Sequence, residues 1–125
     1  DVNASESELA KLESQVHMAN LQFPMKASEE VIIEKVELND EAVIYICRVD
    51  EDLCDMDQIE ANAVEVKKGI VETLADQTDI ATQLFIKYCV NCNRNITYRY
   101  IGNQSEVQHD VVITVSELKD LLKKE

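Results

Sequence analysis

Residues 31–49 read VIIEKVELNDEAVIYICRV, two runs rich in β-branched and aromatic residues on either side of Asn39-Asp40. Such residues favour extended strands, whereas Asn and Asp tolerate the backbone angles of a tight turn. We therefore expect strands over 30–38 and 42–49, paired as an antiparallel hairpin.

A helix is expected before this hairpin, because apolar residues recur at helical intervals through residues 5–20. Phe23-Pro24 ends this helix, since proline disfavours helical geometry in the residue before it. The first part of the chain therefore predicts one helix–strand–strand unit.

The second part of the chain repeats this order with a longer helical stretch. Asp57 is expected to cap that stretch, which breaks at 76–79. A second hairpin follows over 96–101 and 107–115, and Ser116 is expected to cap a short C-terminal helix.

Helices that stand apart from hairpins in this order are typical of an α+β fold. We expect one domain over residues 1–125, in which the two helix–strand–strand units form a four-stranded antiparallel sheet with the helices packed on one face. Parallel winding is not expected, because each strand pair is joined by a turn too short for a crossover.

The strand expected over 42–49 is apolar on both faces. Val43, Tyr45, Cys47 and Val49 share one face, and Ala42, Ile44 and Ile46 share the other. A half-solvated strand alternates apolar with polar residues, so the second face is expected to be covered as well. The sequence leaves three covers open: the C-terminal helix, a second copy of the chain, or long polar side chains of the flanking strands.

The composition excludes several classes of function. The chain has 125 residues, 12 basic and 25 acidic, which gives a formal net charge of −13. Such a surface repels phosphate backbones and anionic headgroups, so neither nucleic-acid nor membrane-surface binding is expected. Apolar residues make up 46%, enough to build a core, and no run approaches the ~18 that a membrane span requires.

The number of cysteines and the identity of the first residue indicate whether the protein is exported or stays in the cytosol. Four cysteines suit an exported protein with one or two disulfides, although reduced buried cysteines fit as well. The chain begins with Asp1 rather than Met, so it is either processed or trimmed, and this start favours an exported protein. Cys89 and Cys92 are expected to form a disulfide or a thiol pair. They follow a helical stripe, a position that disfavours the thiolate of a redox enzyme.

No metal or other cofactor is expected. The four cysteines lack the paired spacing of a zinc site, because six residues separate Cys47 from Cys54. The densest acidic cluster, residues 50–57, lacks the ligand and glycine positions of a helix–loop–helix calcium site. We expect a solvated loop whose acids favour the start of the next helix, and cation binding by this loop stays open.

No catalytic constellation is evident. The two glycines, Gly69 and Gly102, are too far apart for a phosphate-binding loop, and no serine lies in a nucleophile elbow. Tyr98, Arg99 and Tyr100 remain as a candidate partner surface. If the tyrosines face the helices they are core residues and Arg99 points out of the sheet. If they face outward they form a flat amphipathic patch, which protein interfaces favour.

Four short stretches carry a resemblance to a known group of proteins. They are Leu21-Gln22-Phe23-Pro24-Met25-Lys26, Val36-Glu37-Leu38-Asn39, Ala42-Val43-Ile44-Tyr45 and Thr97-Tyr98-Arg99-Tyr100-Ile101-Gly102. Across about 21–115 the chain resembles a loose group of small exported proteins and lipoproteins of Gram-negative bacteria, whose function is uncharacterised. The resemblance implies an α+β domain and a periplasmic or secreted location, with attachment to a lipid before processing as one option. It brings no catalytic residues.

These observations predict a small exported domain that is not an enzyme and that works by binding a protein or by pairing with itself as a homodimer. Two alternatives stay open. An enzyme would need a cleft lined by carboxylates, with His109 as a further candidate, and a metal-binding module would need ligands from the thiols or the acidic loop.

Overall fold

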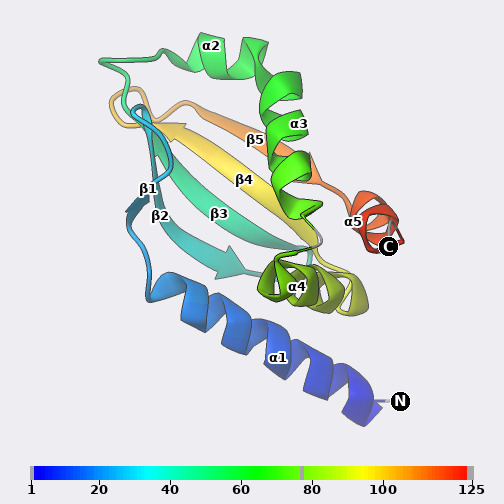
Figure 1. Ribbon diagram of the computed structural model, residues 1–125. Helices are drawn as coiled ribbons and strands as arrows, with labels where there is room; N and C mark the ends of the chain where they lie inside the picture. Colours follow the sequence, from blue (N-terminus) through cyan, green and yellow to red (C-terminus); the bar gives the residue numbers. More distant parts are fainter. Residues whose placement is uncertain (1, 77, 124–125) are drawn as a thin grey trace.

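The computed structural model describes residues 2–76 and 78–123, with side chains from residue 6 onward. Over these residues the chain forms an α+β fold with a five-stranded sheet and five helices. In chain order the elements are α1 (Val2–Asn20), β1 (Met25–Lys26), β2 (Val31–Leu38), β3 (Ala42–Val49), α2 (Met56–Ala61), α3 (Ala63–Leu74), α4 (Ile80–Asn91), β4 (Asn95–Gly102), β5 (Gln108–Ile113) and α5 (Val115–Leu122) (Figure 1).

The sheet is mixed, so the prediction of an antiparallel sheet was wrong in this respect. Its strand order is β1-β2-β3-β4-β5, and every neighbouring pair is antiparallel except β3 and β4, which run parallel. The two expected hairpins, β2–β3 and β4–β5, are both present. Residues 50–94 carry α2, α3 and α4 between β3 and β4, which is enough chain for a crossover that returns in the same direction.

The short edge strand β1 is an element that the sequence did not predict. It pairs Met25 with Ile33 and Lys26 with Ile32. A strand of two residues is too short to show the alternation by which strands are recognised. The link that follows α1 thereby runs along the edge of β2, and Phe23 meets a ring of β3 edge-on.

Two helix caps lie earlier in the chain than the sequence suggested. Asp55 rather than Asp57 caps α2, and Thr114 rather than Ser116 caps α5. Each cap accepts a hydrogen bond from the amide three residues on, while its own amide donates to the side chain at that position. This reciprocal arrangement satisfies two amides that would otherwise lack partners.

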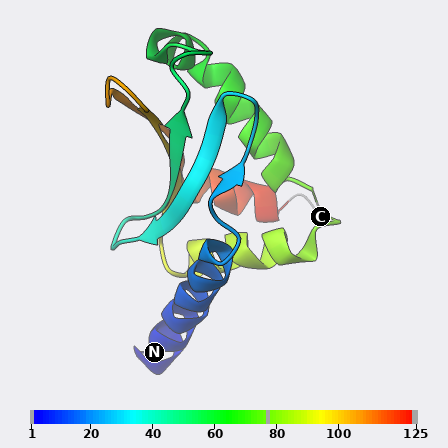
Figure 2. The ribbon, with the colours of Figure 1, turned by 90° about the vertical axis from the view of Figure 1, so that its left-hand side faces the viewer.

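α3, α4 and α5 lie over one face of the sheet, as expected, α2 lies toward its upper end and α1 toward its lower end, and the core fills the space between (Figures 1 and 2). Its fully buried side chains include Leu12, Val43, Ile86, Ile96, Ile113 and Leu118. None of the helices in the described ranges combines the length and apolarity needed to cross a membrane.

The bare face of the sheet shows how the second face of β3 is covered. Ala42, Ile44 and Ile46 are buried there, although no described helix lies over them (Figure 2). Beside Ile46, the ion pair between Arg99 and Asp110 lies across β4 and β5. Side chains of neighbouring strands, including Ile101, thus already bury these residues within one chain, whereas the C-terminal helix packs against the core on the opposite face.

Candidate functional site

The structure places Tyr98, Arg99 and Tyr100 on two different faces of the sheet. Alternation along β4 directs both tyrosines toward the helices and Arg99 toward the bare face. There the guanidinium donates to both carboxylate oxygens of Asp110, at 3.0 and 3.1 Å, and this hydrogen-bonded carboxylate raises the pKa of Arg99. The three residues therefore form no common outward patch, and the tyrosines line a cleft instead.

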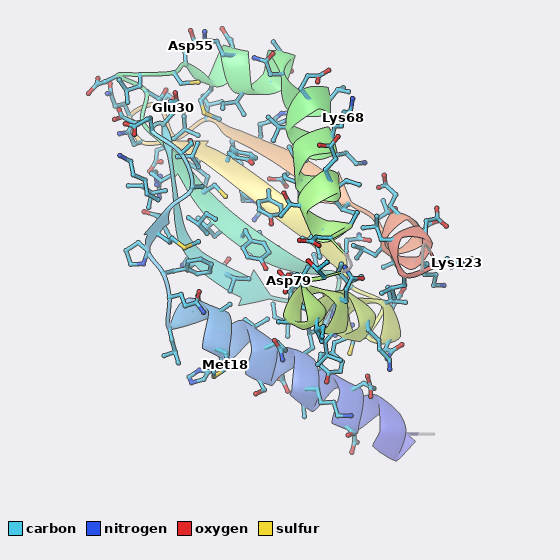
Figure 3. All side chains as sticks on the ribbon, viewed as in Figure 1. Met18, Glu30, Asp55, Lys68, Asp79 and Lys123 are labelled. Atoms are coloured by element: carbon cyan, nitrogen blue, oxygen red, sulfur yellow. The ribbon has the colours of Figure 1, made fainter. Side chains whose placement is uncertain are left out.

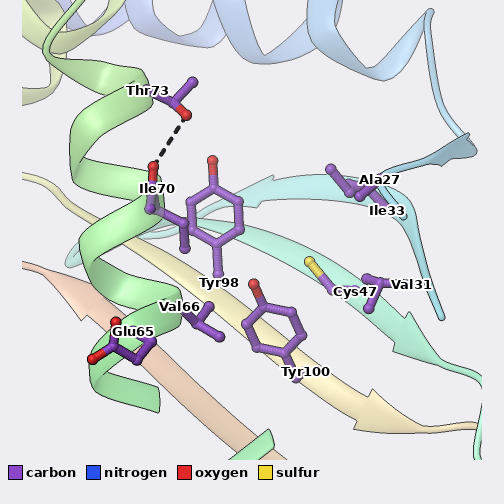
Figure 4. A pocket seen from close by; sticks show the side chains of 11 residues that line it. Ala27, Val31, Ile33, Cys47, Glu65, Val66, Ile70, Thr73, Tyr98 and Tyr100 are labelled. Atoms are coloured by element: carbon purple, nitrogen blue, oxygen red, sulfur yellow. Dashed lines mark hydrogen bonds between the residues drawn. The ribbon is translucent and has the colours of Figure 1, made fainter. Parts of the chain in front are cut away.

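This cleft opens between α3 and the β1–β2 edge of the sheet, and its upper part has a volume of about 470 Å³. The walls and floor are largely apolar or aromatic: Val66 and Ile70 on α3, Val31 and Ile33 on β2, and Tyr98 and Tyr100 on the floor (Figure 4). The crossover between β3 and β4 places α3 opposite β2 and so forms the cleft.

The cleft continues toward α4 and the end of α1. Thr73 and Tyr98 line both parts, so the two hollows adjoin each other. The lower part, about 370 Å³, is lined by Met18 of α1, Met25 of β1 and Phe85 of α4, among others. Methionine side chains are flexible and adapt to irregular apolar surfaces, which suits a site that takes up another molecule.

An aromatic row forms the floor of the cleft. The rings of Tyr45 and Tyr98 stack with centroids 4.7 Å apart, and Phe23 meets Tyr45 edge-on at 6.3 Å. Within the described ranges, no hydrogen bond engages the hydroxyls of Tyr45, Tyr98 or Tyr100. Tyr100 is only 9% exposed, yet its hydroxyl points into the cleft (Figure 4). These hydroxyls are available to a polar group of a bound molecule.

Burial keeps this floor uncharged. It raises the pKa of Tyr98 and that of Cys47 to about 12 each, and it also raises the pKa values of Tyr45 and Tyr100. Removing an anion from water costs free energy, so each group keeps its proton at neutral pH. The floor therefore offers hydrogen-bond donors and apolar surface, and neither a nucleophile nor a charged base.

Gly69 lies in the middle of α3 and lines the cleft. A glycine in a helix interior costs about 1 kcal/mol relative to alanine. A Cβ at this position would meet no atom within 4 Å, so packing within the described chain does not require the glycine. The missing side chain leaves space where another molecule could approach the helix backbone closely.

Acidic side chains form a rim around the apolar cleft. Glu65 lines the cleft on α3, Glu30 directly precedes the lining residue Val31, and Asp79 accepts hydrogen bonds from Thr82, which lines the lower part (Figure 3). Hydrogen bonds from Thr82 hold the pKa of Asp79 below its ordinary value, so this carboxylate is ionised at neutral pH. Together with the net charge of −13, this rim favours cationic groups beside the apolar floor.

All four cysteines are free thiols in this structure. Cys89 is buried in the last turn of α4, and Cys92 is the residue that ends the helix. Burial raises the pKa of Cys89 to about 12 and also raises that of Cys92. Of the two expected states, a disulfide or a thiol pair, the structure has the free thiols. Both thiols stay protonated at neutral pH, which agrees with their place at a helix C-terminus.

The acidic segment 50–57 joins two loops. The carboxylate of Glu51 accepts hydrogen bonds from the amides of Ser105 and Gln104, both at 2.7 Å, and these bonds hold its pKa below the ordinary value. Gly102 allows this approach, because a Cβ there would lie 2.4 Å from Glu51 Oε1. Over residues 2–76 and 78–123, no group of three or more metal-ligating side chains comes together.

The sequence indicated only part of the cleft. It predicted the helical stretch that contains α3 and the candidate core role of Tyr98, but it gave Phe23 and Met25 no role in a site. The walls come from α1, β1, β2, α3 and α4, and their proximity depends on the crossover. The one local signal was Gly69, a glycine within an otherwise regular helical stripe.

Comparison with known proteins shows which fold this chain shares. No protein-family model matches the chain, and no curated protein matches it in sequence. A crystal structure of a Pseudomonas aeruginosa protein classed as secreted aligns with a TM-score of 0.71 at 10% identity, covering 91% of this chain and 95% of that one. The pilotin EpsS of the Vibrio vulnificus type 2 secretion system aligns with a TM-score of 0.66 at 8% identity, covering 94% and 97%. Both proteins share the fold over nearly their whole length.

Proposed function

We propose that this protein is a non-enzymatic exported domain that holds an apolar segment of a partner polypeptide in the cleft between α3 and β2. The cleft carries the proposal, because it combines apolar walls, an uncharged aromatic floor and open space beside Gly69 on a strongly acidic protein. Binding sites are typically concave and mostly apolar, with a few polar groups that fix orientation. The hydroxyls of Tyr98 and Tyr100 are such groups.

Apolar side chains that are exposed beside the cleft favour a polypeptide over a small molecule as the bound partner. Met18 and Met25 line the lower part of the cleft and are 57% and 44% exposed, so apolar surface continues outside it. Small-molecule sites enclose most of their ligand, whereas an exposed apolar patch with a polar rim is typical of a protein interaction site. A segment lying along the cleft would cover both methionines.

The acidic residues around the cleft determine which flanking residues the bound segment should carry. The acidic rim, with Glu30, Glu65 and Asp79, would attract basic side chains at the ends of an apolar stretch. A segment with acidic flanks would be repelled by the same groups. The preferred partner is thus an apolar segment flanked by lysine or arginine.

The structural neighbours support this class of function. One is classed as a secreted protein, and the other is a pilotin of a type 2 secretion system. Their names agree with a periplasmic or secreted location and a protein partner for this chain. The chemistry of the cleft supports the non-enzymatic role, because Glu65 is the one carboxylate that lines its upper part, and His109 lies outside that lining.

Two synthetic peptides test the proposal. One carries a leucine-rich stretch flanked by lysines, and its twin carries glutamates in place of the lysines. We expect the lysine-flanked peptide to shift the amide NMR resonances of α3 and β2, and to bind at least about tenfold more tightly than its twin. The preference should weaken as salt is added, because salt screens exposed charges.

A matched pair of variants on α3 locates the site. Gly69→Leu places a side chain in the open space of the cleft, whereas Lys68→Leu adds the same side chain at an exposed position outside its lining. We expect Gly69→Leu to weaken binding of the lysine-flanked peptide by about tenfold or more and Lys68→Leu to leave it nearly unchanged. Equal binding by Gly69→Leu and the wild-type protein would rule out this cleft.

A further inference from the structure

β5 is the outermost strand of the sheet, with β4 as its one neighbour in the described chain. The amide of Gly102 donates to the carbonyl of Val107 at 2.9 Å, which identifies these two residues as a hydrogen-bonded pair of the ladder. Bonded and non-bonded pairs alternate in an antiparallel ladder, so every second residue of β5 directs its amide and carbonyl away from β4. These residues are Gln108, Asp110 and Val112.

This outer edge lacks the features that usually protect an edge strand. Native edges are blunted by lysine, proline, bulges or unpaired charges. β5 contains no lysine, arginine or proline, and its one carboxylate, Asp110, is paired with Arg99. The opposite edge of the sheet differs, because β1 is two residues long and directly follows Pro24. β5 is therefore the edge that is open to a further strand.

A groove of about 270 Å³ runs beside this edge. Ala63 and Val64 of α3 line it together with Val112 of β5. Val64 is 78% exposed and Val112 is 37% exposed, so apolar surface accompanies the outward backbone groups. A strand added to β5 would cover the side chains and would also satisfy the amides and carbonyls.

We infer that the occupant of this edge is a second copy of the chain, whose own β5 pairs antiparallel across a two-fold axis and joins the two sheets into one. An isologous interface requires a surface that is complementary to itself. A register centred on Val111 sets Asp110 opposite Val112 of the second copy. The outward amides and carbonyls of these two residues then face each other, and a carboxylate lies opposite an apolar side chain rather than another carboxylate. A register centred on Asp110 would set two carboxylates opposite each other, which is unfavourable.

Charge favours this edge as the contact between two copies. Each chain carries a net charge of −13, so two copies repel each other at long range. The strand Gln108–Ile113 adds little to this repulsion, because its one carboxylate is paired. Salt screens the long-range repulsion, so dimerisation is expected to strengthen as salt is added. Binding of a basic segment in the cleft should respond in the opposite direction, which separates the two proposals.

Sedimentation velocity over a series of protein concentrations, at low and at high salt, tests the dimer. Val112→Pro removes an outward amide and leaves the ladder to β4 intact, since proline is tolerated where the amide of an edge strand faces solvent. Val112→Lys places a charge at the same edge. We expect each variant to raise the dissociation constant of the dimer by about tenfold or more, because the two-fold axis introduces each change twice.

Ile32→Lys is the control for these variants. Ile32 is 44% exposed and lies on the bare face of β2, three strands away from β5, so the dimer should persist when it is replaced. In the wild-type protein, hydrogen exchange at the amides of Asp110 and Val112 should slow as concentration rises. A wild-type chain that stays monomeric at high concentration and high salt would overturn the inference. So would a dimer that Ile32→Lys dissociates and Val112→Lys does not.

Discussion

Substitution of Gly69 by alanine replaces a helix-breaking residue in the middle of α3 with the strongest helix former. Alanine also restricts the unfolded chain, which further favours the folded state. The new Cβ would meet no atom within 4 Å, so no steric cost opposes these gains. We expect the free energy of unfolding to rise by about 0.5–1 kcal/mol, which for a domain of this size raises Tm by roughly 2–4 °C.

Urea and thermal unfolding followed by circular dichroism measure this change. The dependence on urea concentration should keep its slope, because the surface exposed on unfolding is nearly unchanged. Lys68→Ala, next to it on the exposed side of α3, is the control and should stay within about 0.5 kcal/mol of the wild-type protein. A lower Tm for Gly69→Ala would mean that the glycine is required by the fold, and it would refute the argument that it leaves the cleft open.

Two further predictions concern the loops and the thiols. Gly102→Ala should displace the carboxylate of Glu51 and lower Tm, because the new Cβ would lie 2.4 Å from Glu51 Oε1. The folded state lowers the pKa of Glu51, so its contribution to stability is complete above the unfolded pKa and is lost as pH falls through the folded pKa. Urea unfolding at neutral and acidic pH should therefore show a smaller acid-induced loss for Gly102→Ala than for the wild-type protein, and an equal loss would contradict this role. A maleimide should label the two partly exposed thiols first and reach Cys47 and Cys89 only on unfolding, because burial excludes the reagent and raises both pKa values to about 12. Rapid labelling of all four thiols in the folded protein, followed by mass spectrometry, would contradict this order.

The local elements of the fold could be read from the sequence because their causes are local. The turn at Asn39 between β2 and β3 is one example, since its side chain accepts hydrogen bonds from the amides of Glu41 and Ala42. The break before α4 is another, because Asp79 caps that helix through Thr82. In both places a side chain bonds the backbone within three residues, so the pattern is visible without the fold.

The candidate site could be predicted only in part. Alternation along β4 limited Tyr98 and Tyr100 to a shared face, but the sequence did not decide which face the helices cover. The expected partner patch combined them with Arg99, which the structure places on the opposite face with Asp110 as its partner. Met25 lines the cleft because it lies on β1. This strand has only two residues, too few to show in the sequence the alternation that predicts a strand.

The sequence by itself determined the α+β class, the two hairpins and the acidic character of the surface, because these follow from composition and from contacts between near neighbours. Only the tertiary structure decided that β3 and β4 run parallel, that α3 stands opposite β2 and that Glu51 reaches the amides of Ser105 and Gln104. Those contacts join residues tens of positions apart. The packing of the whole core selects among the pairings that the local pattern allows, so no short stretch of sequence specifies them.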